Sequence, residues 1–99
     1  MSKGGFVYIV TNLNHSTLYT GVTSDLISRI IQHREKHFPN SFTAKYKCCK
    51  LVYYKDFGHI ESAIEEEKRI KGGSRAKKIE LIESMNPDWE DLYNHIKDW

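Results

Sequence analysis

Two short apolar segments near the start of the chain are separated by a turn-forming stretch. Residues 6–10 are a continuous run of aromatic and β-branched side chains, which is typical of a buried strand. Residues 11–16 contain two asparagines, which tolerate turn conformations, and predict a turn. Because residues 17–22 return to a strand pattern after this short connection, the two segments predict an antiparallel hairpin. Period-two alternation places Tyr19 and Gly21 on one face of the second strand.

A helix is predicted directly after the hairpin. Ser24 or Asp25 would cap its first turn. The apolar residues that follow share one side of the helix: Leu26, Ile27, Ile30 and Ile31. Arg29 and His33 are four positions apart and therefore share a helix face beside this stripe. The helix is expected to end before Pro39, since proline disfavours helical conformation in the preceding residue.

The middle of the chain predicts a third strand and a second helix. A polar, basic loop over residues 40–47 leads to the strand, which is expected at residues 49–55. The helix that follows has a row of apolar residues on one side: Ile60, Ala63, Ile64 and Ile70. Gly72 and Gly73 would end this helix in a C-terminal glycine motif.

Two further helices are predicted at the end of the chain. Ser74 would begin the first, and residues 86–88 form a turn before the second, which is short and has an apolar stripe. The element order β-β-α-β-α-α-α predicts an α+β fold, in which a small three-stranded antiparallel or mixed sheet is flanked by helices. Residues 1–99 are expected to form a single domain.

Composition is that of an ordinary globular protein. Of 99 residues, 39% are hydrophobic and 28% are charged, which argues against disorder. No apolar run approaches the length of a membrane span, and the first five residues lack the apolar core of a signal peptide, so we expect a cytoplasmic location. The adjacent Cys48 and Cys49 are expected to be small residues in or beside a strand, at least one of them buried, without a disulfide or a zinc ion.

The net charge is only +2, but basic residues cluster in two segments of the chain. The first cluster is Lys36, Lys45, Lys47 and Lys50, and the second is Arg69, Lys71, Arg75, Lys77 and Lys78. A locally basic surface on a nearly neutral domain suits a nucleic-acid backbone. Solvated helix faces are the commoner origin of such clusters, and this alternative stays open.

One glutamate of the second predicted helix is expected to face the body of the protein. Glu67 falls seven residues after Ile60 in the apolar series, whereas Glu65 and Glu66 are expected to point to solvent. An isolated carboxylate in that position is unfavourable and requires a cation, a metal ion or strong donors. A purely structural ion pair with Arg29 is one alternative.

Five residues whose side chains could take part in catalysis are thus expected around one sheet edge: Tyr8, Tyr19, Arg29, His33 and Glu67. At these positions the sequence resembles the GIY-YIG nuclease domain. The two signatures of that family correspond to Phe6-Val7-Tyr8 and Tyr19-Thr20-Gly21, its helical arginine to Arg29 and its metal-binding glutamate to Glu67. Residues 18–23, 67–72 and 86–89 look like the small single-domain members, which resemble the nuclease module of the excision-repair endonuclease.

The resemblance implies a metal-dependent DNA endonuclease that hydrolyses phosphodiester bonds. Glu67 would hold one divalent ion, Mg²⁺ or Mn²⁺, and Arg29 would grip the scissile phosphate with its planar fork. Tyr19 is expected to accept the proton of the attacking water, and Tyr8 to orient Tyr19 or the water. His33 would assist the proton transfer.

Further residues are expected to contact DNA around this centre. Gly21 would let the DNA backbone approach the strand closely. The resemblance also offers Asn86 as a candidate counterpart of a family asparagine near the metal. Backbone contacts are expected from the basic side chains Lys36, Lys45, Lys47, Lys50, Arg69 and Lys71. The substrate classes considered are branched and damaged DNA, in repair or recombination, and a protein partner or a homodimer would add specificity.

Two competing interpretations accompany the nuclease hypothesis. His33 and His37 have a spacing that can bind zinc, but the sequence offers no obvious third ligand. The more serious alternative is a nucleic-acid-binding or partner-recruiting module on the same fold, with catalysis absent or weak.

Overall fold

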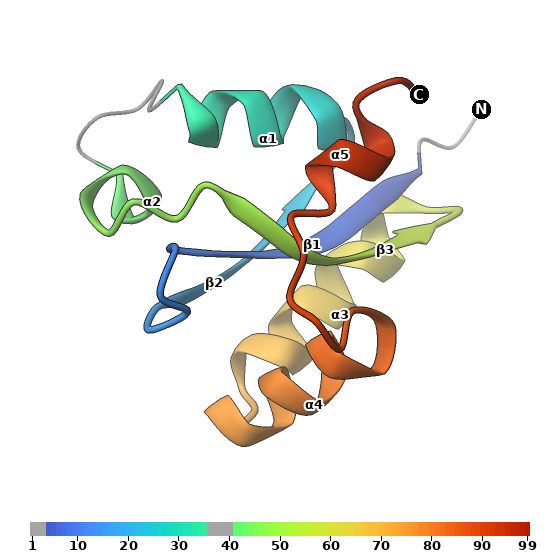
Figure 1. The fold of residues 1–99 in the computed structure, drawn as a ribbon. Coiled ribbons are helices and arrows are strands. Elements are labelled where there is room, and N and C mark those ends of the chain that lie inside the picture. Colours follow the sequence, from blue (N-terminus) through green and yellow to red (C-terminus); the bar gives the residue numbers. More distant parts are fainter. Residues whose placement is uncertain (1–3, 36–40) are drawn as a thin grey trace.

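Three antiparallel strands form a sheet at the centre of the molecule (Figure 1). The computed structural model describes residues 4–35 and 41–99. Strands β1 (Gly5–Thr11), β2 (Leu18–Thr23) and β3 (Lys50–Phe57) lie in the order β2-β1-β3. The predicted hairpin and the three-stranded α+β fold are therefore confirmed, with β1 in the middle and β2 at an edge.

Strand β1 is buried on both faces, which accounts for its unbroken apolar run. Val7 and Ile9 belong to a core cluster on one face of the sheet, and Tyr8 and Val10 to a cluster on the other. All four are at most 1% exposed. The sheet thus separates two cores, each of which requires its own helices.

Helices cover both faces of the sheet (Figure 1). On one face, helices α1 (Leu26–Arg34) and α5 (Tyr93–Ile96) bury apolar side chains against the cluster that contains Tyr8. On the other face, α3 (Ile60–Lys71) and α4 (Arg75–Met85) pack against the second cluster. Side chains from α1 and α3 can therefore meet only beyond the rim of the sheet.

Two of the predicted helix starts are confirmed by their capping bonds. A carboxylate oxygen of Asp25 accepts from the backbone N–H of Ser28 at 3.2 Å, and the Ser74 hydroxyl accepts from Lys77 N–H at the same distance. Each cap satisfies an N–H that the first helical turn leaves without a partner.

Three local details differ from the expectations. Residues 40–47 were predicted as a loop, but helix α2 (Phe42–Lys45) forms there, too short to leave a periodic pattern in the sequence. Strand β3 begins at Lys50 and extends to Phe57, beyond the predicted residues 49–55. Helix α3 ends at Gly72 as expected, but no described glycine has a positive φ, and Gly72 keeps φ at −75° where the glycine motif would have a left-handed residue.

Two expectations from composition can also be compared with the structure. Cys48 is buried and Cys49 is partly buried, and neither forms a disulfide. Within residues 4–35 and 41–99, none of the helices has the length and apolar character needed to cross a bilayer.

Candidate active site

The hairpin brings the two predicted tyrosines together on the face of the sheet that α1 covers. Tyr8 pairs with Gly21 and Val10 pairs with Tyr19 across β1 and β2. The rings of Tyr8 and Tyr19 have centroids 6.5 Å apart. Their environments differ, because Tyr8 in the central strand is 1% exposed whereas Tyr19 on the edge strand is only partly buried.

Gly21 provides the space that the Tyr8 ring occupies. A Cβ atom added at Gly21 would overlap the Cζ and Oη atoms of Tyr8. We expected this glycine to admit the DNA backbone, but a protein side chain fills the space beside its Cα. The glycine of the second signature is therefore required by the tyrosine of the first.

A chain of hydrogen bonds starts at the buried Tyr8 hydroxyl. Tyr8 Oη lies 2.9 Å from His33 Nε2, and His33 Nδ1 lies 2.8 Å from Thr43 Oγ1. A hydroxyl can donate or accept, so either tautomer of a neutral imidazole satisfies both contacts. His33 thus joins the central strand to α2. Thr43, which is 4% exposed, was missed by the sequence analysis because nothing in the pattern predicts α2.

The environment keeps both Tyr8 and His33 neutral. Burial raises the pKa of Tyr8 well above its ordinary value, and the neighbouring Tyr19 adds to the shift; Glu67 raises this pKa further, and Arg29 lowers it. Burial, with a smaller contribution from Arg29, lowers the pKa of His33 to about 4. At neutral pH the pair is therefore a phenol bonded to an uncharged imidazole.

Glu67 reaches the same region from the opposite face of the sheet. Its side chain is 15% exposed, in agreement with the inward orientation predicted for it. One carboxylate oxygen lies 3.3 Å from Lys71 Nζ, one helical turn later on α3. The Lys71 ammonium also lies over the Tyr19 ring, 5.6 Å from its centroid. Lys71 therefore supplies the positive charge that a half-buried carboxylate requires, and it links Glu67 to Tyr19.

Arg29 lies on α1 and acts electrostatically on both members of the buried pair. Its positive charge lowers the pKa of Tyr8 and that of His33. It does not form the ion pair with Glu67 that the sequence left open, since the salt-bridge partner of Glu67 is Lys71. The guanidinium consequently retains its capacity to bind an anion.

One neighbouring glutamate differs from expectation. Glu66 was predicted to point to solvent, but its side chain is only 18% exposed. Arg69 binds it with two charge-assisted hydrogen bonds of 2.7 and 2.6 Å, through Nε and Nη2. The Arg69 bonds lower the pKa of Glu66. This pair is formed within one helix, so apolar periodicity alone could not reveal it.

Asn86 has a structural explanation that the sequence did not suggest. It is 3% exposed at the end of α4, and its side-chain amide donates to the carbonyls of Val52 and Glu90 at 3.1 and 2.8 Å. Its side-chain oxygen accepts from Glu90 N–H at 2.9 Å. These bonds fasten the end of α4 to β3 and occupy the groups that a metal or a substrate would need.

The basic residues predicted to bind DNA are not equivalent. Lys50 Nζ lies 3.0 Å from His15 Nε2, and the guanidinium of Arg69 is held by Glu66. Lys71 is part of the candidate active site through Glu67. The remaining described members, Lys45 and Lys47, are exposed on and after α2, and Lys36 lies outside the described residues.

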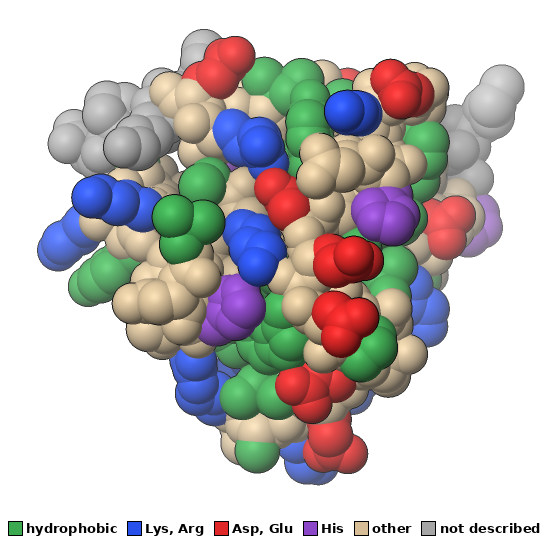
Figure 2. Space-filling view, in the orientation of Figure 1, with side chains coloured by type: hydrophobic (Ala, Val, Ile, Leu, Met, Phe, Trp, Pro, Cys, Tyr) green, Lys and Arg blue, Asp and Glu red, His purple; other side chains and the backbone are tan. Residues whose placement is uncertain are grey.

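One face of the molecule carries charges of both signs. The face drawn in Figure 2 shows Lys and Arg side chains separated from one another, with acidic side chains spread between them from top to bottom. A continuous basic surface is therefore not a feature of this face.

Exposed aromatic rings continue outward from Tyr19. The Tyr19 and Phe42 rings have centroids 5.8 Å apart, and those of Phe42 and Tyr46 are 4.6 Å apart. Phe42 is 46% exposed and Tyr46 is 43% exposed. Large exposed aromatic side chains beside a polar centre offer flat surfaces against which a nucleobase can stack.

The carboxylates of the site limit which metal ion it suits. In the described part of the chain, no group of three or more His, Cys, Asp or Glu side chains is arranged to hold a metal ion. A zinc or calcium cage is therefore not formed by these residues. A single carboxylate, Glu67, could hold a divalent ion whose remaining ligands are water and phosphate oxygens.

Comparison with known proteins identifies the family. A family model described as the GIY-YIG catalytic domain matches residues 4–80. The chain belongs to this family. The matched range includes Tyr8, Tyr19, Arg29, His33 and Glu67, and it ends before the buried asparagine at the end of α4. Membership in the GIY-YIG family associates the chain with nucleases.

Relatives of similar length support the same assignment. A UPF0213 protein of Syntrophus aciditrophicus is 33% identical over 88 residues, covering 89% of this chain and 98% of the relative. One from Staphylococcus saprophyticus is 37% identical over 81 residues, covering 78% and 92%. The NMR solution structure of a UPF0213 protein from Bacillus halodurans is 28% identical, with a TM-score of 0.57 and coverage of 90% and 93%.

We expect Gly21→Ala to destabilise the protein by about 2 kcal/mol or more, because its methyl group would overlap the buried Tyr8 ring. Gly58→Ala is the matched control, since a Cβ at Gly58 meets no atom within 4 Å. Urea unfolding of both variants measures the difference. Equal stabilities would contradict the packing of Tyr8 against Gly21.

We expect acid to weaken the fold through His33. The pKa of His33 is about 4 when folded, below the value of 6.5 expected for an unperturbed histidine. Since the unfolded chain then binds the proton more readily, this contribution to the free energy of unfolding is complete above about pH 6.5 and decreases as the pH falls through about 4. Unfolding of the protein and of His33→Gln over this pH range tests it. A variant with the same pH dependence as the native protein would contradict the assignment.

Proposed function

We propose that this protein is a metal-dependent DNA endonuclease that hydrolyses phosphodiester bonds. The observation that supports the proposal is the convergence of opposite charges at one buried phenol. Arg29 and Glu67 come from helices on opposite faces of the sheet, yet both influence the Tyr8 hydroxyl. Packing of the fold does not require such an arrangement, whereas a phosphodiester hydrolase can use a cation to stabilise the phosphate and a carboxylate to hold a metal ion.

The side chains have different parts in the proposed reaction. Arg29 binds the scissile phosphate, because its guanidinium is not used by Glu67 and can form two parallel bonds to phosphate oxygens. Tyr19 accepts the proton of the attacking water, since it is the partly exposed tyrosine and has the Lys71 ammonium above its ring. Tyr8 orients the reacting groups as a neutral hydrogen-bonding phenol.

His33 acts through Tyr8 in this proposal. Both of its ring nitrogens already have hydroxyl partners, Tyr8 Oη and Thr43 Oγ1. Its depressed pKa favours the uncharged ring, which can accept from one partner while it donates to the other. His33 thus positions the Tyr8 hydroxyl.

Glu67 is the residue proposed to hold a divalent ion, Mg²⁺ or Mn²⁺. When bound, such an ion neutralises charge that develops on the phosphate and on the leaving oxygen. Binding would require the carboxylate to exchange its contact with Lys71 for the ion. Lys71 would keep its position over the Tyr19 ring and would also be available to the substrate phosphate.

DNA is the proposed substrate, with backbone contacts from the exposed Lys45 and Lys47 and base stacking on Phe42 and Tyr46. Branched or damaged DNA in repair or recombination is the setting we propose. A cytoplasmic location, and specificity from a protein partner or a homodimer, belong to the same proposal.

We expect Glu67→Gln and Tyr19→Phe each to reduce cleavage by at least about 100-fold, because the first removes the proposed metal-binding carboxylate and the second the proposed general base. Glu65→Gln on the same helix and Tyr54→Phe on the same sheet face are matched controls and should retain activity. The measurement is cleavage of flapped, nicked and branched DNA in Mg²⁺ or Mn²⁺.

The alternative hypothesis, a nucleic-acid-binding module without catalysis, predicts a different result. It would bind the same DNA without products, and Glu67→Gln would leave that binding unchanged. Metal-dependent products that persist in both Glu67→Gln and Arg29→Ala would also contradict the proposed site, because they would originate elsewhere.

A further inference from the structure

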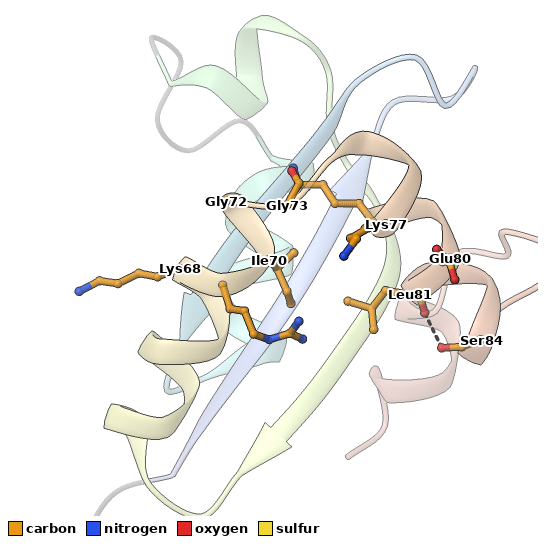
Figure 3. Close-up of a pocket in the computed structure, with 10 residues that line it drawn as sticks. Lys68, Ile70, Gly72, Gly73, Lys77, Glu80, Leu81 and Ser84 are labelled. Carbon is orange, nitrogen blue, oxygen red and sulfur yellow. Dashed lines mark hydrogen bonds between the residues drawn. The ribbon is translucent and has the colours of Figure 1, made fainter.

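A hollow of about 660 Å³ lies between the C-terminal half of α3 and helix α4 (Figure 3). None of the proposed catalytic side chains lines it. Its rim carries four cationic side chains, from Lys68, Arg69, Lys77 and Lys78, and a single carboxylate, from Glu80. Like charges around one hollow repel one another unless an anion lies between them.

The cations of the hollow differ in how far the protein already uses them. Arg69 is bound by Glu66, and Lys78 Nζ donates to the carbonyl of Gly73 at 3.0 Å. Among the residues that the structure describes, no carboxylate lies within salt-bridge distance of Lys68 or Lys77. Figure 3 shows Lys77 directed into the space between the helices and Lys68 extended outward from the rim. Two ammonium groups are therefore available to a ligand.

The floor of the hollow is suited to more than an inorganic anion. Ile70 and Leu81 contribute apolar surface, and Gly72 and Gly73 leave the backbone uncovered by side chains. The volume falls within the range typical of small-molecule sites. Cationic rims over an apolar floor fit a phosphodiester unit, which combines a charged phosphate with a less polar sugar and base.

The hollow is connected to the candidate active site along α3. Lys68 and Lys71 are three residues apart and are therefore neighbours on the helix surface. Lys71 in turn contacts Glu67 and lies over Tyr19. Between Glu67 and Gly73 the chain advances about 9 Å at 1.5 Å per residue, and one DNA strand covers a similar distance in about three nucleotides. A strand at the catalytic residues would reach the hollow within a few nucleotides.

We propose that the α3–α4 hollow binds the phosphodiester backbone of the DNA strand that flanks the cleaved bond. This proposal rests on the proposed nuclease function and adds to it a second contact site, which affects affinity and leaves the chemical step unchanged. Lys77 is the central residue of this contact site, and the negative charge of Glu80 weakens its attraction for a phosphate.

Charge reversal at the hollow provides the test. Lys77→Glu places a glutamate three residues after the N-cap Ser74, the spacing of a capping box, so the helix should not lose stability. Glu80→Lys removes the opposing carboxylate. Lys97→Glu, at an exposed position after α5, makes the same charge change away from the hollow. Circular dichroism verifies that all three variants fold.

Binding of a fluorescent flapped DNA is measured by anisotropy in EDTA, between about 50 and 200 mM KCl. We expect Lys77→Glu to weaken binding at least about fivefold at the lower salt concentration and to reduce the salt slope by about 1 to 2. Glu80→Lys should tighten binding, and Lys97→Glu should change it less than about twofold. Equal effects of Lys77→Glu and Lys97→Glu would overturn the proposal.

Cleavage in Mg²⁺ at saturating DNA separates this proposal from the nuclease proposal. Unchanged maximal rates for Lys77→Glu, with weaker binding, support the hollow as a flanking site. A protein that binds with the expected charge dependence but never cleaves would contradict the nuclease and leave the hollow supported. A protein that cleaves, with Lys77→Glu indistinguishable from Lys97→Glu, would contradict the hollow alone.

Discussion

The buried hydroxyl of Tyr8 is the constraint on which the site depends. Its ring fills the space beside Gly21 in the adjacent strand, and its oxygen is bonded to His33 on α1. A buried hydroxyl without a partner would cost about 1–3 kcal/mol, so the position of α1 relative to the sheet is coupled to this bond. His33 continues the connection to Thr43, which fixes α2 in turn. One phenol thereby joins both strands of the hairpin to two helices.

This constraint makes the two signature tyrosines unequal. Tyr8 is enclosed in the central strand, where burial opposes loss of its proton. Tyr19 lies on the edge strand, beside the Lys71 ammonium and the exposed ring of Phe42. Because β2 is an edge, charged side chains from α1 and α3 can approach the same point from opposite faces. An internal strand would keep the two faces of the sheet apart.

Periodicity predicted much of this arrangement. The hairpin, the face of Tyr19 and Gly21, and the inward orientation of Glu67 follow from spacings of two and seven residues. Helix α2 was missed because a single turn leaves no period, and Thr43 was missed with it. The amide bonds of Asn86 depend on backbone carbonyls far away in sequence. Identification of Lys71 as the partner of Glu67 required side-chain geometry, since several cations were equally available in the sequence.

Binding of Mn²⁺ followed by NMR tests the central claim most directly, because it reports on the site without requiring DNA cleavage. The account predicts that Mn²⁺ broadens the amide signals of residues around Glu67 and Tyr19, that signals around Lys97 remain sharp, and that Glu67→Gln abolishes the broadening. The broadening should also include the part of α1 that carries Arg29, because the charges of Arg29 and Glu67 both act on the Tyr8 hydroxyl. Broadening centred elsewhere, or broadening that persists in Glu67→Gln, would contradict the claim that these residues form one metal-dependent site.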